Sequence, residues 1–184
     1  AIAVMGILMA FMSLIFMPVF GITQGAQPLI GYNFGARKFT RVRHLFWSTA
    51  VATTVLMVLG WGSSQLFPEG IMSLFVPAGS SLIPLGVHAL RIFTLAFPII
   101  GFPITGGHLF QAIGKPVPAA LLALSRQVIL FIPFILVFPL FWGLEGIFYA
   151  APASDTLTFL ISLWVVGRQL RRLHRLPPEP PAVP

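Results

Sequence analysis

Residues 21–37 read GITQGAQPLIGYNFGAR, and this stretch decides the fold class of the chain. It begins inside a long apolar run and ends in a basic segment that carries Arg37, Lys38, Arg41 and Arg43. Amides, a proline and several glycines therefore lie where an apolar helix reaches water. Lipid-exposed backbone cannot leave its polar groups unsatisfied, so such residues are covered by neighbouring helices or line a wet cavity. The stretch predicts a polytopic membrane protein that moves something, because a passive anchor has no use for these residues.

The composition supports residence in a membrane. The 184 residues are 57% hydrophobic and only 8% charged, whereas a soluble domain usually carries about 25% charged residues. The net charge of +7 could suggest a nucleic-acid partner. The basic residues, however, fall in short clusters between apolar runs, so we expect the lipid bilayer as partner and no nucleic acid. The absence of cysteine excludes disulfides and thiolate metal sites.

Five apolar runs are long enough to cross a bilayer, which takes about 20 residues in a helix. They are residues 1–30, 45–67, 85–111, 117–141 and 144–166. Prolines interrupt the first, third and fourth, and the first and third are long enough to tilt or kink.

Two other segments are not expected to span. Residues 68–84 read as a loop with a short interfacial helix around its apolar group at 71–76. The Pro-rich end predicts a disordered tail over residues 173–184, which leaves residues 1–172 as the transmembrane part.

The basic residues predict the orientation. Nine of the eleven follow the first span, lie between the third and fourth, or follow the fifth, and with five spans these positions share one face. The opposite face carries Glu69 and Glu145. Because cytoplasmic loops are enriched in Lys and Arg, we expect a multi-pass protein of the cell inner membrane with a cytoplasmic C-terminus.

Four motifs resemble one family of transporters. Residues 25–37 (GAQPLIGYNFGAR) are similar to the end of the eighth helix in the multidrug and toxin extrusion (MATE) family. Residues 109–115 (LFQAIGK), 124–127 (LSRQ) and 151–155 (APASD) resemble its tenth, eleventh and twelfth helices. Each motif alone is weak, but all four occur in the family's order and spacing.

The resemblance implies an all-α fold, in which this chain supplies the last five helices of a twelve-helix transporter. The chain is then a fragment, the C-terminal lobe, and its missing partner is the N-terminal lobe of the same protein. The family exports amphipathic, cationic drugs by alternating access in exchange for Na⁺ or H⁺. No enzymatic activity and no cofactor are implied, since the coupling ion binds transiently. The third span lacks a carboxylate that some sodium-coupled members carry, so the driving ion is left open.

Two charged residues within the spans are candidate site residues. Intramembrane ionisable residues are functional candidates and usually have a partner. Arg126 and Asp155 lie at similar depths, about 13 and 17 Å from the same end of neighbouring antiparallel helices at about 1.5 Å per residue. Contact between them is therefore feasible. A structural ion pair and a role in transport are both compatible with the sequence, and the structural pair is favoured.

Three further candidates are Gln24, Gln27 and Arg91. The two glutamines could offer hydrogen bonds in a cleft, or could satisfy backbone groups freed near Pro28. Arg91 could snorkel outward or pair with Glu145.

Two rival functions stay open. A lipid-linked saccharide flippase of the same superfamily predicts basic residues in the cleft for a pyrophosphate. A membrane scaffold subunit that transports nothing predicts no polar residues converging on a cavity.

Overall fold

The computed structural model describes residues 2–75 and 82–176, and all regular structure in them is helical. Two long helices come first, α1 (Ile2–Gly35) and α2 (Phe39–Leu66), followed by the short α3 (Pro68–Ser73). The third span comprises α4 (Leu82–Phe93) and α5 (Phe97–Ala112). The fourth comprises α6 (Pro116–Leu124), the π-helix η1 (Ser125–Leu130) and α7 (Phe131–Trp142), and the fifth is α8 (Leu144–Arg175).

Length and composition confirm five candidate spans. Four helical segments could each cross a membrane alone, and α4 with α5 makes a fifth if the bent pair counts as one span. The all-α membrane fold predicted from the sequence is therefore correct. The expected short helix after the second span is also present as α3, although residues 76–81 lie outside the described part of the chain.

The third span differs from the single kinked helix expected over residues 85–111. Its two halves meet at 51° across residues 94–96. Pro98 lies in the first turn of α5 and has no N–H to donate to Thr94. The chain instead makes hydrogen bonds that span three residues and not four, from Phe97 N to Thr94 O and from Ile99 N to Ala96 O, both 3.0 Å.

Polar side chains of the neighbouring helix α2 form hydrogen bonds with groups at the break in the third span. Ser64 Oγ of α2 lies 2.8 Å from Thr94 Oγ1, and Gln65 Nε2 donates to the Arg91 carbonyl at 3.1 Å. This agrees with the rule that irregular backbone at membrane depth is tolerated where protein covers it.

The fourth span contains a π-helical segment that the sequence did not predict. Pro133 lies in the first turn of α7, so it cannot donate a helical hydrogen bond to the preceding turn. The wider turns of η1 absorb this interruption, and they place Arg126 at the point where the helix changes its winding.

A tight turn joins α7 to α8. Gly143 has φ 56° and ψ −136°, a conformation open to glycine and costly for other residues. Gly146 then packs so closely that a Cβ there would lie 2.5 Å from the backbone of Phe138. The two glycines bring the fourth and fifth spans side by side as a hairpin.

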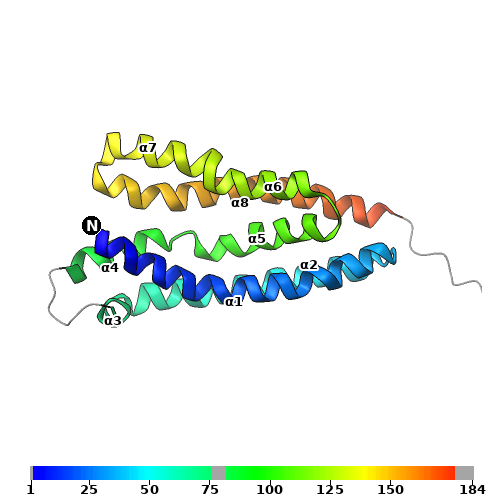
Figure 1. Cartoon of the computed structure of the whole chain (residues 1–184), viewed down its shortest axis with the longest axis horizontal. Helices are drawn as coiled ribbons and strands as arrows, with labels where there is room; N and C mark the ends of the chain where they lie inside the picture. Colours follow the sequence, from blue (N-terminus) through cyan, green and yellow to red (C-terminus); the bar gives the residue numbers. More distant parts are fainter. Residues whose placement is uncertain (1, 76–81, 177–184) are drawn as a thin grey trace, which may run out of the picture.

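The helices form a bundle along one long axis, with the α6–α7 span and α8 on one side, α1 and α2 on the other, and α4–α5 between them (Figure 1). Helix α1 packs on α2, α4 and α5, while α7 packs on α8. Two clusters of buried apolar side chains hold the layers together, one around Phe97 and Leu8 and one around Phe46 and Leu109.

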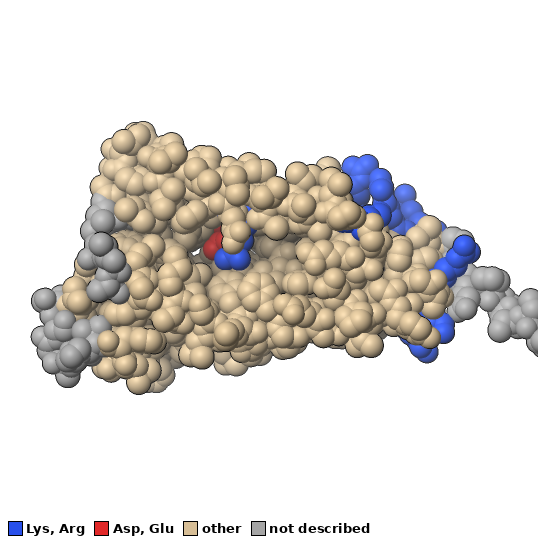
Figure 2. Space-filling view, in the orientation of Figure 1, with Lys and Arg blue, Asp and Glu red and all other residues tan. Residues whose placement is uncertain are grey.

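One end of the bundle carries most of the basic residues. The α1–α2 turn, the α5–α6 turn and the end of α8 meet there (Figure 1), and basic side chains gather at that end in Figure 2. Lys115 Nζ donates to Gln169 Oε1 at 2.9 Å and Arg43 Nη1 donates to His174 Nδ1 at 3.0 Å, which ties the turns to α8. We call this end the basic end.

Helix α8 is longer than the apolar run expected as the fifth span. Helix α8 continues past residue 166 to Arg175, and Leu173 is buried. The boundary expected after residue 172 therefore lies inside a helix. Residues 177–184, the rest of the expected tail, lie outside the described residues.

Candidate functional site

A hollow of about 460 Å³ opens between α1 and the layer formed by η1, α7 and α8. Its walls are thioether and aromatic side chains, and its polar groups are those of Ser13, Arg126, Gln127, Ser154 and Asp155. The apolar wall comprises Met9, Met12, Met17, Phe16, Phe20, Phe93, Phe131 and Ala151. Figure 2 shows a basic and an acidic group meeting in a hollow in the middle of the face, apart from the basic groups at one end of the bundle. We call this hollow the central hollow.

The two charges in the central hollow bond to each other. Arg126 Nε donates to Asp155 Oδ1 at 2.6 Å, and the side chains are 24% and 6% exposed. The guanidinium carbon also lies 5.3 Å from the centroid of the Phe16 ring. Arg126 thus contacts a carboxylate and an aromatic face at once, which connects α1 to α8 through η1.

A second hollow of about 240 Å³ continues toward the basic end between α5 and α6. Phe20, Arg126 and Gln127 line both hollows, so these three side chains form the partition between them. The ion pair therefore lies at the boundary between two adjoining cavities.

Four polar side chains gather next to the second hollow. An open hollow of about 630 Å³, which we call the polar hollow, is lined by Gln24 and Gln27 of α1 and by His108 and Gln111 of α5. His108 Nδ1–H donates to Gln27 Oε1 at 3.3 Å. His108 and Gln111 also line the second hollow, so each of the three hollows shares lining residues with the next.

Helical periodicity explains why these residues share one face. Side chains three or four positions apart lie on the same side of a helix. Helix α1 presents Phe16, Phe20, Gln24 and Gln27 at this spacing, apolar toward one end and polar toward the basic end. Helix α5 adds Ile104, His108 and Gln111, and α8 adds Ala151, Asp155 and Thr158. The result is a continuous stripe that changes from apolar to polar along the bundle.

The structure brings together four of the five candidates named from sequence. Arg126 and Asp155 are bonded, and Gln24 and Gln27 lie in the polar hollow. Arg91 is exposed on α4 and lines none of these three hollows. Its suggested partner, Glu145, has a side chain that lies outside the described part of the structure.

His108 and Gln111 line the site although the sequence did not single them out as candidates. Their spacing from Ile104 on one helical face was the available signal, but the facing residues of α1 lie about 80 positions away in sequence, as the 81-residue separation of Gln27 and His108 illustrates.

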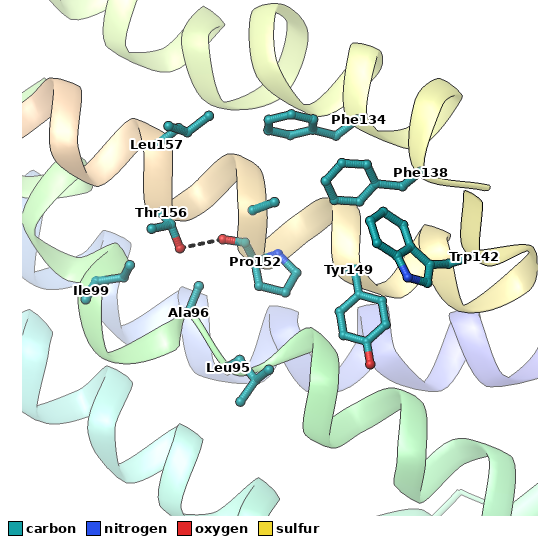
Figure 3. Close-up of a pocket in the computed structure, with 11 residues that line it drawn as sticks. Leu95, Ala96, Ile99, Phe134, Phe138, Trp142, Tyr149, Pro152, Thr156 and Leu157 are labelled. Carbon is teal, nitrogen blue, oxygen red and sulfur yellow. Dashed lines mark hydrogen bonds between the residues drawn. The ribbon is translucent and has the colours of Figure 1, made fainter. Parts of the chain in front are cut away.

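A further hollow of about 700 Å³ lies on the opposite side of α8 (Figure 3). Phe134, Phe138 and Trp142 of α7 face Tyr149 and Pro152 of α8 across it, and the break at Leu95 closes one side. Its described lining residues include no carboxylate, amide or basic side chain. It is larger than the central hollow, yet those residues offer no charged or amide group that could orient a charged molecule.

The chemistry of the central hollow and its two neighbours suits a molecule with an apolar body and a polar or cationic group. Aromatic faces and methionines adapt to varied apolar shapes and attract cations. The amides and His108 add hydrogen-bond donors and acceptors toward the basic end. Among the described residues that line these hollows, Asp155 is the one carboxylate, and it is bonded to Arg126.

Known proteins share this architecture. A family model described as MatE matches residues 1–137. The multidrug export protein MepA of Staphylococcus haemolyticus (strain JCSC1435) is 26% identical over 165 residues, which cover 84% of this chain and 34% of MepA. MepA of Staphylococcus aureus (strain NCTC 8325 / PS 47) is 24% identical over 150 residues, covering 80% and 32%. The chain thus spans about a third of the length of these relatives.

Solved structures agree. DinF-BH, a MATE multidrug transporter in complex with R6G, superposes with a TM-score of 0.84 at 34% identity, over 95% of this chain and 39% of that one. An outward-facing multidrug resistance MATE family transporter of the MOP superfamily gives 0.86 at 17% identity with the same coverage, which supports the fold.

Proposed function

The chain belongs to the MATE family of multidrug transporters, and we propose that it is the C-terminal lobe of a secondary antiporter that exports amphipathic, cationic drugs. Its membership in a family of transporters, which are not enzymes, and its five candidate spans identify a multi-pass membrane protein. Export would proceed by alternating access, in exchange for Na⁺ or H⁺. The partners of this chain would be the drug, the bilayer and an N-terminal lobe facing the central hollow.

One observation carries this proposal, namely the stripe of Met, Phe, amide and charged side chains that faces the three adjoining hollows. Drug sites are mostly apolar with a few convergent polar groups. In transporters built from two lobes, substrate sites lie near the bilayer midplane between the lobes. The stripe lies on the face that α1, η1 and α8 leave open, where a second lobe would close it.

DinF-BH, at 34% identity, was solved with R6G bound. By analogy we expect bulky aromatic cations among the substrates of the transporter to which this chain belongs. The rings of Phe16, Phe20 and Phe131 would hold the apolar body of the substrate. The partition at Arg126 would separate a substrate position in the central hollow from one in the second hollow, nearer the basic end.

The roles of Arg126 and Asp155 follow from their bond. Because the carboxylate is almost fully buried and already engaged, we assign the pair a structural role, holding η1 against α8 at the partition. The coupling ion would then be bound elsewhere in the whole transporter. Gln24, Gln27, His108 and Gln111 are left as the groups that bind substrate.

The rivals fit the arrangement less well. A flippase for a pyrophosphate-linked saccharide needs cationic groups free in the cleft, but Arg126 is neutralised by Asp155 and Arg91 lines none of the three hollows. A scaffold subunit has no need for amides from two helices converging on one hollow, as they do here.

The basic end gives the orientation that we propose for the chain. Nine of the chain's eleven Lys and Arg residues belong to the turns and the helix end that meet at the basic end. We place that end, with the C-terminus, on the cytoplasmic side of a cell inner membrane.

The test is dye export by the whole transporter that contains these helices, expressed in cells without other drug pumps. Gln27→Leu with Gln111→Leu removes two amides from the polar hollow, and we expect energy-dependent export of a cationic dye to fall at least tenfold at equal protein level. A tenfold change corresponds to about 1.4 kcal/mol, about what one or two hydrogen bonds contribute.

Gln65→Leu is the matched control, because Gln65 lies on α2 and donates to the Arg91 carbonyl, away from the stripe. It should leave export per molecule within about twofold of the parent. Unchanged export in the double variant would show that these two amides do not bind the exported molecule. No export of any cationic dye by the parent protein would contradict the proposed function itself.

A further inference from the structure

The basic end contains a hollow that drug export does not explain. It measures about 510 Å³ and lies between the α1–α2 turn and the end of α8. Arg37, Arg41, Arg43 and His174 line it, together with the apolar side chains of Phe39 and Leu173. We call it the basic hollow. It lies at the opposite end of α1 from Met9 and Met12, and so apart from the central hollow.

In the part of the chain that the structure describes, the side chains around the basic hollow carry a strong excess of positive charge. Nine Lys and Arg residues belong to this end of the bundle. Among the residues whose side chains the structure describes, the acids are Glu69, in α3 beyond the far end of α2, and Asp155, which is bonded to Arg126. Neither lines the basic hollow. Several positive charges within one concave surface attract an anion strongly, especially where the low dielectric of the bilayer begins.

The hydrogen bonds of the hollow orient its donors. A guanidinium has donors only, so Nδ1 of His174 accepts from Arg43 Nη1 and carries no proton. This bond fixes the Arg43 side chain against α8 and leaves its other N–H groups available. Arg37 occupies the turn with φ 55°, where Lys38 N donates to Asn33 O at 2.9 Å. The α1–α2 turn thereby places Arg37 on the exposed rim, opposite the end of α8.

The apolar floor selects the kind of anion. Phe39, which contacts the ring of Phe34 edge to face, and Leu176, which is 44% exposed, give the hollow an apolar floor above the buried Leu173, and the arginines form its basic rim. A free phosphate would use only the rim. A molecule that carries a phosphate on an apolar body uses both, and lipids of the surrounding leaflet have this structure.

We propose that the basic hollow binds the phosphate headgroup of an anionic membrane lipid, with Arg37, Arg41 and Arg43 around the phosphate and the glycerol and upper acyl carbons against Phe39 and Leu176. The site would hold the α1–α2 turn to the end of α8. It depends on the membrane location of the chain and not on which molecule the transporter exports.

Native mass spectrometry of the purified full chain in detergent micelles tests the proposal. The chain is titrated with phosphatidylglycerol and, separately, with phosphatidylcholine of the same acyl chains. We expect one phosphatidylglycerol to bind about 25-fold more tightly than phosphatidylcholine, since the two exposed arginines Arg37 and Arg41 each contribute about 1 kcal/mol, or about fivefold, to the attraction of an anionic lipid.

The informative variant is Arg37→Asn with Arg41→Gln. Both side chains are exposed, and Asn tolerates the left-handed backbone at position 37. At about fivefold for each lost arginine, the first bound phosphatidylglycerol should weaken about 25-fold, to the level of phosphatidylcholine.

The charge-matched control is Arg171→Gln with Arg172→Gln. These arginines are exposed on α8 at the same end of the bundle but do not line the hollow. The control should weaken binding by less than about threefold. Equal weakening in the two double variants would show diffuse attraction to the basic end and would overturn the proposal.

Competition identifies the source of the phosphate. Inorganic phosphate at 10-fold excess over the lipid should leave the bound phosphatidylglycerol in place if the apolar floor contributes, as proposed here. Displacement by inorganic phosphate would show a simple anion site and would refute the assignment to a lipid. A circular dichroism spectrum equal to that of the parent confirms that each variant is folded.

Discussion

At the scale of single residues, the pair formed by Arg126 and Asp155 shows both the reach and the limit of the sequence. Their depths and the short turn between their helices predicted that contact was feasible, and the 2.6 Å bond confirms it. The third member of the cluster, Phe16, could not be found in this way. It lies 110 positions before Arg126, and only the packing of α1 onto α4 and α5 brings its ring to the guanidinium.

We expect a structural pair to show strong coupling in a double-mutant cycle. Breaking a buried ion pair by removing one partner costs about 3–5 kcal/mol, because the other charge is left uncompensated. Since Arg126 keeps 24% exposure, the lower end of that range applies. Arg126→Ala and Asp155→Ala should each lower the midpoint of thermal unfolding in detergent, and the double variant should recover much of the loss.

Asp155→Asn separates this role from ion coupling. A structural carboxylate predicts that Asp155→Asn loses stability and protein level, and that export per remaining molecule persists. Normal protein level with complete loss of dye export, with or without Arg126, would identify Asp155 as a coupling residue and contradict the structural assignment.

At the scale of helices, five spans could be predicted from apolar length, but their internal irregularities could not. Proline content indicated that the third and fourth spans are interrupted. The break fell at residues 94–96, before Pro98, and a π-helix formed before Pro133. Both outcomes depend on which neighbour satisfies the freed backbone. In the third span these are Ser64 and Gln65, about 30 positions earlier in the chain.

The contact between α2 and α5 depends on one glycine. Thr53 Oγ1 lies 3.1 Å from Thr105 Oγ1, and a Cβ on Gly101 would lie 3.0 Å from Thr54 N. Small residues permit such close helix approach in membranes. Overpacking costs about 1–3 kcal/mol, so Gly101→Ala should lower the unfolding midpoint measurably.

Gly107→Ala provides the matched control on the same helix, because no atom lies within 4 Å of a Cβ built there. It should match or slightly exceed the parent in thermal stability, since alanine favours the helix by about 1 kcal/mol. Equal behaviour of the two variants would show that α2 and α5 can separate at no cost.

At the scale of the whole molecule, the basic clusters predicted which turns share an end, and Figures 1 and 2 agree with that arrangement. The polar face could not be predicted as a unit, because it combines residues from α1, α5, η1 and α8. The resemblance of four short motifs identified the family correctly. The position of the ion pair between two hollows is visible only in the three-dimensional structure.

Reporter fusions test the orientation of the whole chain. A reporter placed after Arg43, Lys115 or Arg175 should read cytoplasmic, and one after Glu69 or Gly143 should read external, because Lys and Arg are retained on the cytoplasmic side. Alkaline phosphatase and green fluorescent protein fusions at the same positions give opposite signals and control for expression. An external reading after Arg43 would reverse the proposed orientation.

The tight turn at Gly143 also bears on how the chain enters the bilayer. Arg and Asp each cost about 2.5–3.5 kcal/mol at the centre of a helix during insertion. Because η1, which contains Arg126, continues into α7 and the turn returns the chain at once into α8, the two charges can meet within a single helical hairpin during biosynthesis. The fourth and fifth spans would then leave the translocon together as an electrically neutral unit, and neither would have to enter lipid alone.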